Sequence, residues 1–273
     1  MRAHTRRRFL SATSIPLAAF LGEGPAFAGS SYSETVLKKH TVAYWRLGEK
    51  HGPDAADVSG NGHTGQYIGK PIFGEAGAIA GDPDTSIGIK PSGNYVEIPS
   101  SPQFSVASSG SGLSIEVWMR PDVLTFPGET SDPYVLWLGK GQGKEMEWGF
   151  RFYSKHSTRP NRISAYVWNA DGGLGAGAYF QDKLKVGEWI HIVATFDACT
   201  PDNPNAGVSI YKNGELRGSP ATSPGALYSS YSIKPQAGSA PVRLGTRDLG
   251  SFLTGGLDEV AIYPRKLTAS EIK

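Results

Sequence analysis

Short segments in which apolar and polar residues alternate run along most of this chain. A period of two is typical of β-strands with one buried face, and no long segment shows the 3.6-residue period of a helix. Gly, Pro and Asn separate the segments, and Asn213-Gly214 predicts a type I′ hairpin. Strands are expected at 42–47, 95–98, 113–120, 134–138, 148–153, 162–168, 176–180, 189–196, 208–211, 215–217, 242–244 and 257–263. With 35 glycines and 19 prolines, the pattern predicts an all-β, antiparallel two-sheet sandwich.

Alternation also assigns side chains to faces, because neighbouring residues of a strand point to opposite sides of the sheet. The apolar sets of 148–153 and 162–168 predict one common opposite face that carries Arg151, Tyr153, Tyr166 and Trp168. Aromatic rings beside a charged donor are typical of surfaces that stack on sugars and hydrogen-bond their hydroxyls. We expect a glycan site there, where Trp168→Ala weakens binding with little loss of stability. The alternative is that loops bury these rings.

The N-terminus has the features of an export signal. Thr-Arg-Arg-Arg-Phe-Leu at 5–10 matches the twin-arginine pattern, and an apolar stretch follows, then Ala26-Phe27-Ala28 as a cleavage site. The apolar stretch is shorter than the roughly 20 residues that span a bilayer. We therefore expect a signal peptide at 1–28 and a secreted chain that does not stay in the membrane. The alternative is a basic N-terminus before an amphipathic helix.

Charge and cysteine content exclude other classes. The whole chain has a net charge of +2, but the leader contributes four Arg and one Glu, so the remainder is close to neutral. No run of Lys and Arg indicates nucleic-acid binding. The one cysteine, Cys199, cannot form a disulfide within the chain and is interpreted as a loop residue, which suits folding in the reducing cytoplasm before export.

Ordered landmarks carry a resemblance to a known family. They are the segment 43–49, the Asp-x-Ser-Gly-Asn-Gly loop at 57–62, the segment 93–99, Glu-x-Trp-x-x-Pro at 116–121, the segments 187–193 and 208–214, and Gly-x-Asp-Glu-Val-x-Ile-Tyr at 256–263. The last is followed by Thr268-x-x-Glu271, the spacing of a helix capping box. Together they resemble bacterial laminin G-like (concanavalin A-like) jelly-roll domains.

The resemblance implies a single jelly-roll domain over 40–273, after a loose lead-in at 29–39. It also implies that the first and last strands lie close together. We expect a monomer. Similar domains run slightly further, so a fragment that ends at Lys273 is an alternative.

The resemblance further implies a structural Ca²⁺ where the first and last strands meet, with Asp258 at the position of the ligand. Asp57 and Asn61, in the nearby Gly-rich loop, add oxygen atoms of the kind that Ca²⁺ prefers. The alternative is that Asp57 and Asn61 form Asx-turns and Asp258 accepts backbone N–H bonds.

Catalytic patterns give little support to an enzyme. Relatives on this fold that hydrolyse glucans carry Glu-x-Asp-x-x-Glu on one strand, and this chain lacks it. Glu145-Met-Glu147 has no third carboxylate, and His191 with Tyr153 or Tyr166 lacks the remaining residues of known lyases. We expect a non-catalytic module that binds carbohydrate or a cell-envelope glycan. The alternative is a polysaccharide hydrolase or lyase with an atypical active site.

Overall fold

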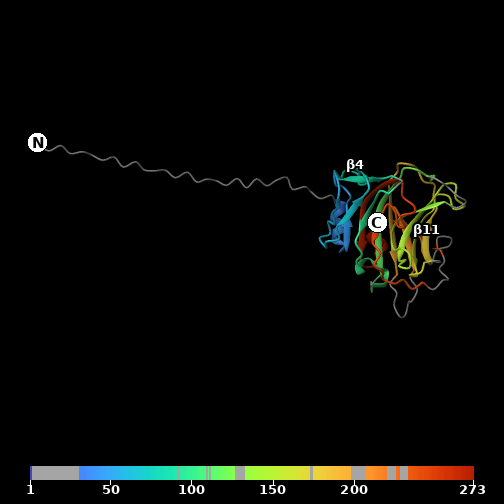
Figure 1. Ribbon diagram of the computed structural model, residues 1–273. Coiled ribbons are helices and arrows are strands. Elements are labelled where there is room, and N and C mark those ends of the chain that lie inside the picture. Colours follow the sequence, from blue (N-terminus) through green and yellow to red (C-terminus); the bar gives the residue numbers. More distant parts are fainter. Residues whose placement is uncertain are drawn as a thin grey trace.

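The computed structural model describes Met1 and residues 31–273, apart from 91–92, 109, 111, 127–132, 173–174, 198–206, 220–225 and 228–232. The cleavage site and the rest of the expected leader after Met1, together with Cys199, lie outside the described residues. Two antiparallel sheets pack face to face, and the C-terminal end lies on the domain (Figure 1). The two-sheet, all-β fold expected from the alternating pattern is therefore confirmed.

One sheet has eight strands in the order β14-β13-β12-β7-β17-β5-β4, with β1 also paired to β17. Their bounds are β1 Ala43–Trp45, β4 Ile72–Ala76, β5 Thr85–Ile89, β7 Leu113–Pro121, β12 Ile190–Phe196, β13 Val208–Lys212, β14 Glu215–Gly218 and β17 Gly255–Tyr263. Ala43 pairs with Ile262 and Trp45 with Val260, so the first and last strands are neighbours, as expected. Asn213 and Gly214 have φ of 51° and 81° between β13 and β14, which the primed hairpin turn requires.

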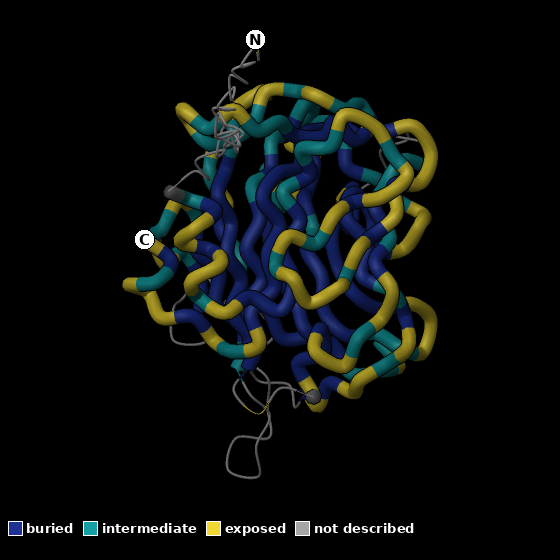
Figure 2. The backbone as a smooth tube through the Cα atoms, turned by 90° about the vertical axis from the view of Figure 1, so that its left-hand side faces the viewer, coloured by how far each residue is buried: buried dark blue, intermediate teal, exposed yellow. Residues whose placement is uncertain are grey.

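The other sheet has nine strands in the order β15-β11-β10-β9-β8-β16-β6-β3-β2. Their bounds are β2 Asp54–Ala55, β3 Gly65–Ile68, β6 Tyr95–Ile98, β8 Tyr134–Lys140, β9 Trp148–Tyr153, β10 Ile163–Trp168, β11 Gly175–Phe180, β15 Ala226–Leu227 and β16 Val242–Leu244. Between the sheets lies one apolar core, which includes Trp45, Trp137, Trp148 and Phe150, all fully buried. Figure 2 shows buried strands framed by exposed loops.

Short helices complete the fold: α1 Ser31–Lys38, η1 Pro102–Phe104, η2 Val106–Ser108 and α2 Ala269–Ile272. Glu271 accepts the Thr268 N–H at 2.8 Å, the bond that the capping-box spacing predicts. Residues 31–38, expected as part of a loose lead-in, instead form α1. Val36 of this helix is buried in a second apolar cluster, and the hydroxyl of Tyr32 donates to Glu116 at 2.8 Å. The helix therefore packs on the outer face of the eight-stranded sheet.

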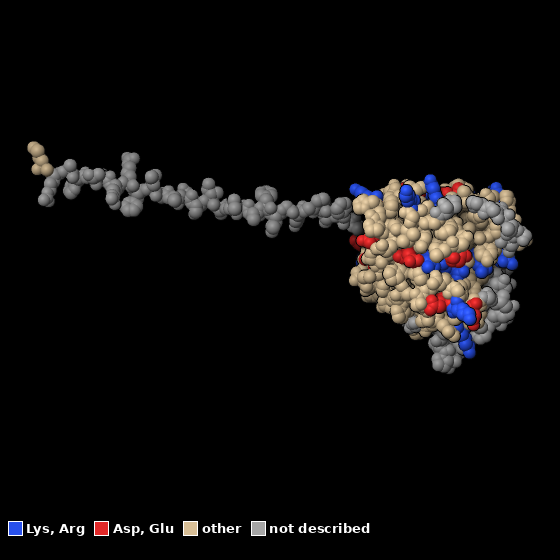
Figure 3. Space-filling view, in the orientation of Figure 1, with Lys and Arg blue, Asp and Glu red and all other residues tan. Residues whose placement is uncertain are grey.

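No helix in the described part of the chain is long and apolar enough to cross a membrane. On the face drawn in Figure 3, basic and acidic side chains lie next to one another rather than in separate patches.

Candidate functional site

The four predicted ligand residues do lie together on the outer face of the nine-stranded sheet. Strands β9 and β10 pair with Ser164 opposite Arg151 and Tyr166 opposite Gly149. The Arg151 guanidinium lies 4.7 Å from the centre of the Tyr166 ring and 5.7 Å from that of Trp168. The Tyr153 and Tyr166 hydroxyls are 3.5 Å apart, and the Tyr166 and Trp168 rings stack at 5.4 Å. The opposite parity, including Phe150, Phe152, Ile163 and Val167, lies in the core.

Sequence reasoning missed two residues of this group. Tyr134, on the expected strand 134–138, lies with its ring 4.5 Å from the Arg151 guanidinium. Arg247, in the irregular segment after β16, lies 5.2 Å from the Trp168 ring. The alternating pattern could have placed Tyr134, but it gives no information on a residue outside a strand. We call the six residues the Arg151 cluster: Tyr134, Arg151, Tyr153, Tyr166, Trp168 and Arg247.

Glycines let the aromatic rings of the cluster lie flat on the sheet. A Cβ at Gly175 would come within 2.7 Å of the Trp168 ring, and one at Gly177 within 2.8 Å of the Tyr166 ring. Both rings are 2% exposed and Tyr153 is fully buried. The expectation of open stacking rings therefore needs correction, because their faces pack on the sheet and beneath arginine side chains. Tyr134, 39% exposed, and the half-buried Arg151 form the accessible part of the cluster.

The two arginines of the cluster lack acidic partners. Within the described residues, neither Arg151 nor Arg247 has a carboxylate at ion-pair distance, and the buried Nε of each has no hydrogen-bond partner. Arg151 donates through Nη1 to the Tyr153 hydroxyl at 3.4 Å, and Nη1 of Arg247 contacts the sulfur of Met146. Burial lowers the pKa of Arg247; the negative charge of Asp248 opposes this effect, and the positive charge of Arg151 adds to it. The arrangement is a cationic, aromatic-lined surface on which no described carboxylate lies at ion-pair distance from either arginine.

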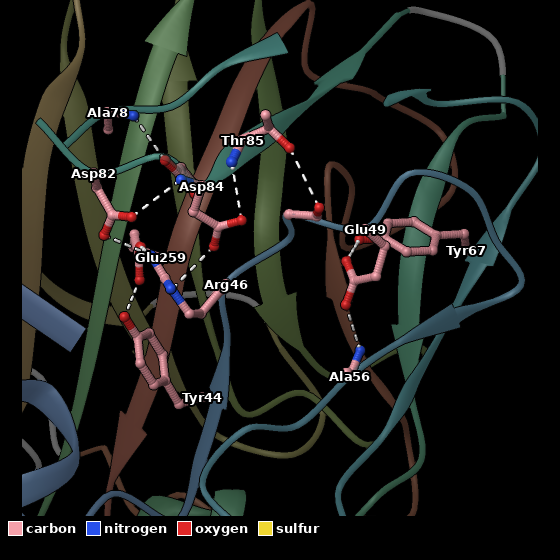
Figure 4. A network of polar contacts seen from close by, with 12 residues as sticks. Tyr44, Arg46, Glu49, Ala56, Tyr67, Ala78, Asp82, Asp84, Thr85 and Glu259 are labelled. Atoms are coloured by element: carbon pink, nitrogen blue, oxygen red, sulfur yellow. Dashed lines mark hydrogen bonds and ion pairs between the residues drawn. The ribbon is translucent and has the colours of Figure 1, made fainter. Parts of the chain in front are cut away.

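A second polar cluster surrounds Arg46 beside the last strand (Figure 4). Arg46 reaches Asp82 at 2.7 Å, Asp84 at 3.0 Å and Glu259 at 2.9 Å. Tyr44 donates its hydroxyl to Glu259. Burial raises the pKa of Glu259 to about 8. One cation thus faces three carboxylates, which leaves the cluster with an excess of acidic groups.

Asp258, the expected Ca²⁺ ligand, lies next to this cluster. Its Oδ2 accepts the Ala78 N–H at 2.7 Å, while its buried Oδ1 has no hydrogen-bond partner. Burial raises the pKa of Asp258 to about 7, and the charge of Asp84 acts in the same direction. An unpartnered buried carboxylate oxygen beside further carboxylates fits a hard cation.

Asp57 and Asn61 have different surroundings. Asp57 accepts backbone N–H bonds from Tyr44, Ser59 and His63 at 2.9–3.0 Å, and Asn61 donates its amide to the carbonyls of residues 41 and 42. These are the bonds of an Asx-turn that ties the loop to β1. Among the described residues, no bond joins Asp57 or Asn61 to Asp258, and no group of three His, Cys, Asp or Glu side chains is arranged for a metal. A cation at Asp258 would therefore need backbone carbonyls and water as well.

A pocket of about 680 Å³ lies on the outer face of the eight-stranded sheet, between α1 and α2. Among its lining residues, Glu116 accepts from Tyr32 and from His191, each at 2.8 Å. Tyr263 also donates to Glu116. Burial would raise the pKa of Glu116, but the bond and charge of His191 and the bond of Tyr263 outweigh it and hold that pKa at about 2. Each of these three donors to the carboxylate belongs to the fold itself.

The model of a protein family described as the concanavalin A-like lectin/glucanases superfamily matches residues 90–273. The chain belongs to this superfamily. No curated protein matches the chain. The match begins just before β6 and takes in all strands of the Arg151 cluster, so the cluster lies on the part of the fold that members of the superfamily share.

Solved structures extend the likeness to most of the chain. Domain 4 of AbnA, a GH43 extracellular arabinanase from Geobacillus stearothermophilus in complex with arabinotriose, is 20% identical, with a TM-score of 0.54 over 85% of this chain and 96% of that chain. The binding domain of botulinum neurotoxin serotype G is 15% identical, with a TM-score of 0.58 over 85% of this chain and 49% of that one. The chain thus spans about half the length of the botulinum domains. At these identities the likeness shows the fold alone.

Proposed function

We propose that this chain is a secreted, non-catalytic recognition module that binds a carbohydrate through the Arg151 cluster. The observation that carries the proposal is the position of Arg151, half-buried among the rings of Tyr134, Tyr166 and Trp168 with its Nε unpartnered. Such a group can donate to a sugar oxygen, while the exposed ring of Tyr134 offers a surface for stacking. The presence of arabinotriose on a domain of the same fold supports a saccharide as the ligand class.

Export supports the same function from the sequence side. A twin-arginine signal at 1–28 delivers a folded domain to the cell exterior, where polysaccharides and envelope glycans are the abundant partners. The absence of the Glu-x-Asp-x-x-Glu pattern favours recognition over hydrolysis.

The test is calorimetric titration of residues 29–273 against a panel of oligosaccharides that includes arabino-oligosaccharides. Arg151→Gln should weaken binding by about 1–3 kcal/mol, the range for losing an anchor residue. The control is Arg217→Gln on β14 of the other sheet, which removes the same charge from an ion pair with Asp182. If no saccharide binds, or if both variants bind as the wild type does, the proposal is wrong.

The proposal includes a structural Ca²⁺ held by Asp258. The unpartnered Oδ1 of Asp258 and the nearby carboxylate of Asp84 are the side-chain oxygens that fit the ion. Asp57 and Asn61, engaged in their turn, would stabilise the adjacent first strand. Bound Ca²⁺ would neutralise the acidic excess around Arg46 and fix the loop 77–84 to β17.

The Glu116–His191 pair supports a second candidate, a glycan-active enzyme. In a carboxylate–imidazole pair beside a pocket of about 680 Å³, the carboxylate of Glu116 can orient the imidazole of His191 as a general base. The same panel, incubated with the protein and assayed for reducing ends and unsaturated products, tests it. Activity that Glu116→Gln abolishes would establish the enzyme and displace the non-catalytic proposal. Complete lack of product from every glycan that binds would exclude it.

A further inference from the structure

The surroundings of Arg247 indicate a narrower class of ligand than saccharides in general. It is 7% exposed, and its guanidinium lies 5.2 Å from the Trp168 ring, to which Arg151 also comes within 5.7 Å. Two cationic groups thus meet at one indole ring. The neighbouring Asp248 directs Oδ1 to the N–H groups of Gly250 and Ser251 instead of pairing with Arg247.

Other buried cations near this face have carboxylate partners, unlike Arg151 and Arg247. Arg243 binds Glu97 at 2.8 Å, and Lys140, fully buried, binds Glu147. Arg151 and Arg247 have no such partner among the described residues. Removing a cation from water without an opposite charge is unfavourable, and two such cations at one ring repel each other. An anion at this place would relieve both effects.

The free atoms of both guanidinium groups point to the kind of anion. Each uses Nη1 in a contact with the protein, to the Tyr153 hydroxyl or the Met146 sulfur, and no bond of Nε or Nη2 is seen among the described residues. The Nε and Nη2 edge of arginine is planar and matches the two oxygens of a carboxylate. Because the Nε of each arginine is buried, a carboxylate on a sugar would approach the accessible part of the Arg151 guanidinium, with the charge of Arg247 beneath it.

Resting on the proposed function, we propose that the glycan is acidic, a polymer with uronic acid residues, and that Arg151 and Arg247 bind its carboxylate. Tyr134 and Arg151 would meet the ligand at the surface, while Arg247 supplies the second positive charge from beneath. A sulfated sugar carries a charge of the same sign, so the experiment separates the two anions.

The experiment compares matched polymers on residues 29–273. Polygalacturonate and alginate are titrated beside their carboxyl-reduced derivatives, which keep the sugar backbone and lack the charge, and beside a sulfated galactan. At least one uronate polymer should bind 10-fold or more tightly than its reduced form, and more tightly than the sulfated galactan. That affinity should fall as salt rises, because the contact is between charges.

Variants test whether the arginines cause the preference for the uronate polymer. Arg247→Gln should weaken binding of the uronate polymer about 10-fold, Arg247→Lys should weaken it less, and Arg217→Gln should leave it unchanged. Equal binding of a polymer and its reduced form, or preference for the sulfated galactan, overturns the acidic-sugar inference and leaves saccharide recognition standing. If none of these polymers binds while neutral oligosaccharides do, the inference also fails; if no saccharide binds at all, the proposed function fails with it. The wild-type comparison of charged and reduced polymers decides the matter even if Arg247→Gln does not fold.

Discussion

Replacing Trp168 by alanine tests whether the rings of the Arg151 cluster are structural. The ring is 2% exposed, stacks on Tyr166 at 5.4 Å, and has two guanidinium groups within 5.7 Å. Removing a buried tryptophan side chain costs about 3–5 kcal/mol, because apolar contacts are lost and a cavity remains. Over some 245 residues, each kcal/mol lowers Tm by about 2–4 °C, so the expected fall is roughly 6–20 °C.

The assay is thermal and urea unfolding of the wild type, Trp168→Ala and Trp189→Ala. Trp189 is the matched control, since it also has a guanidinium, that of Arg120, at 5.1 Å but is half-buried. We expect Trp189→Ala to lose less than half as much stability. If Trp168→Ala instead unfolds within about 1 kcal/mol of the wild type, the ring is accessible and the buried arrangement described above is wrong.

Two further predictions concern charge. Saturating Ca²⁺ should raise the Tm of the wild type relative to chelator, by an amount equivalent to about 2.7 kcal/mol at 100 times Kd. Asp258→Asn should abolish this increase, and the surface variant Asp54→Asn should keep it. An unchanged wild-type Tm in chelator would refute the site. Glu116 has a pKa of about 2 in the folded protein against 4.5 unfolded, so it stabilises the fold above pH 4.5 and that contribution, about 3 kcal/mol, is lost as pH falls through 2. Urea unfolding between pH 2 and 6 should show this loss in the wild type and not in Glu116→Gln, and equal pH profiles would contradict it.

Side-chain parity explains why Arg151, Tyr153, Tyr166 and Trp168 could be grouped on one face from the sequence. A strand has a period of two, so the position of Phe150 and Phe152 in the core fixes Arg151 and Tyr153 on the other face. The same rule on the paired strand fixes Tyr166 and Trp168, and no knowledge of distant parts of the chain is needed.

Exposure could not be predicted in that way, because it depends on what covers the sheet. The cover over Trp168 includes Arg247, which follows β16 and is 79 positions away in the sequence. An irregular segment has no periodic pattern that would place it over a particular strand. Parity therefore identifies a face, while only the folded chain shows which rings on it reach solvent.

Helix α1 and the loop at Asp57 show the same difference between contacts that are local in sequence and contacts that are not. The helix was missed because eight residues give a weak periodic signal, and what holds Tyr32 is Glu116, 84 positions away. Asp57 and Asn61 instead act within their own turn and on the adjacent strand, which is the arrangement that Asp and Asn near glycines favour locally. Contacts within a short segment could be predicted from the sequence, whereas partners far away in the sequence could not.

The two outer faces of the sandwich differ in a way that decides where a ligand is expected. At the pocket on the eight-stranded sheet, three donors from the protein satisfy the buried carboxylate of Glu116: Tyr32, His191 and Tyr263. On the nine-stranded sheet Lys140 and Arg243 have carboxylate partners, but no described carboxylate lies at ion-pair distance from Arg151 or Arg247. A satisfied charge contributes to the fold, whereas an unsatisfied one gains most from an external partner. A ligand charge is therefore expected to stabilise the protein more at the Arg151 cluster than at the pocket beside Glu116.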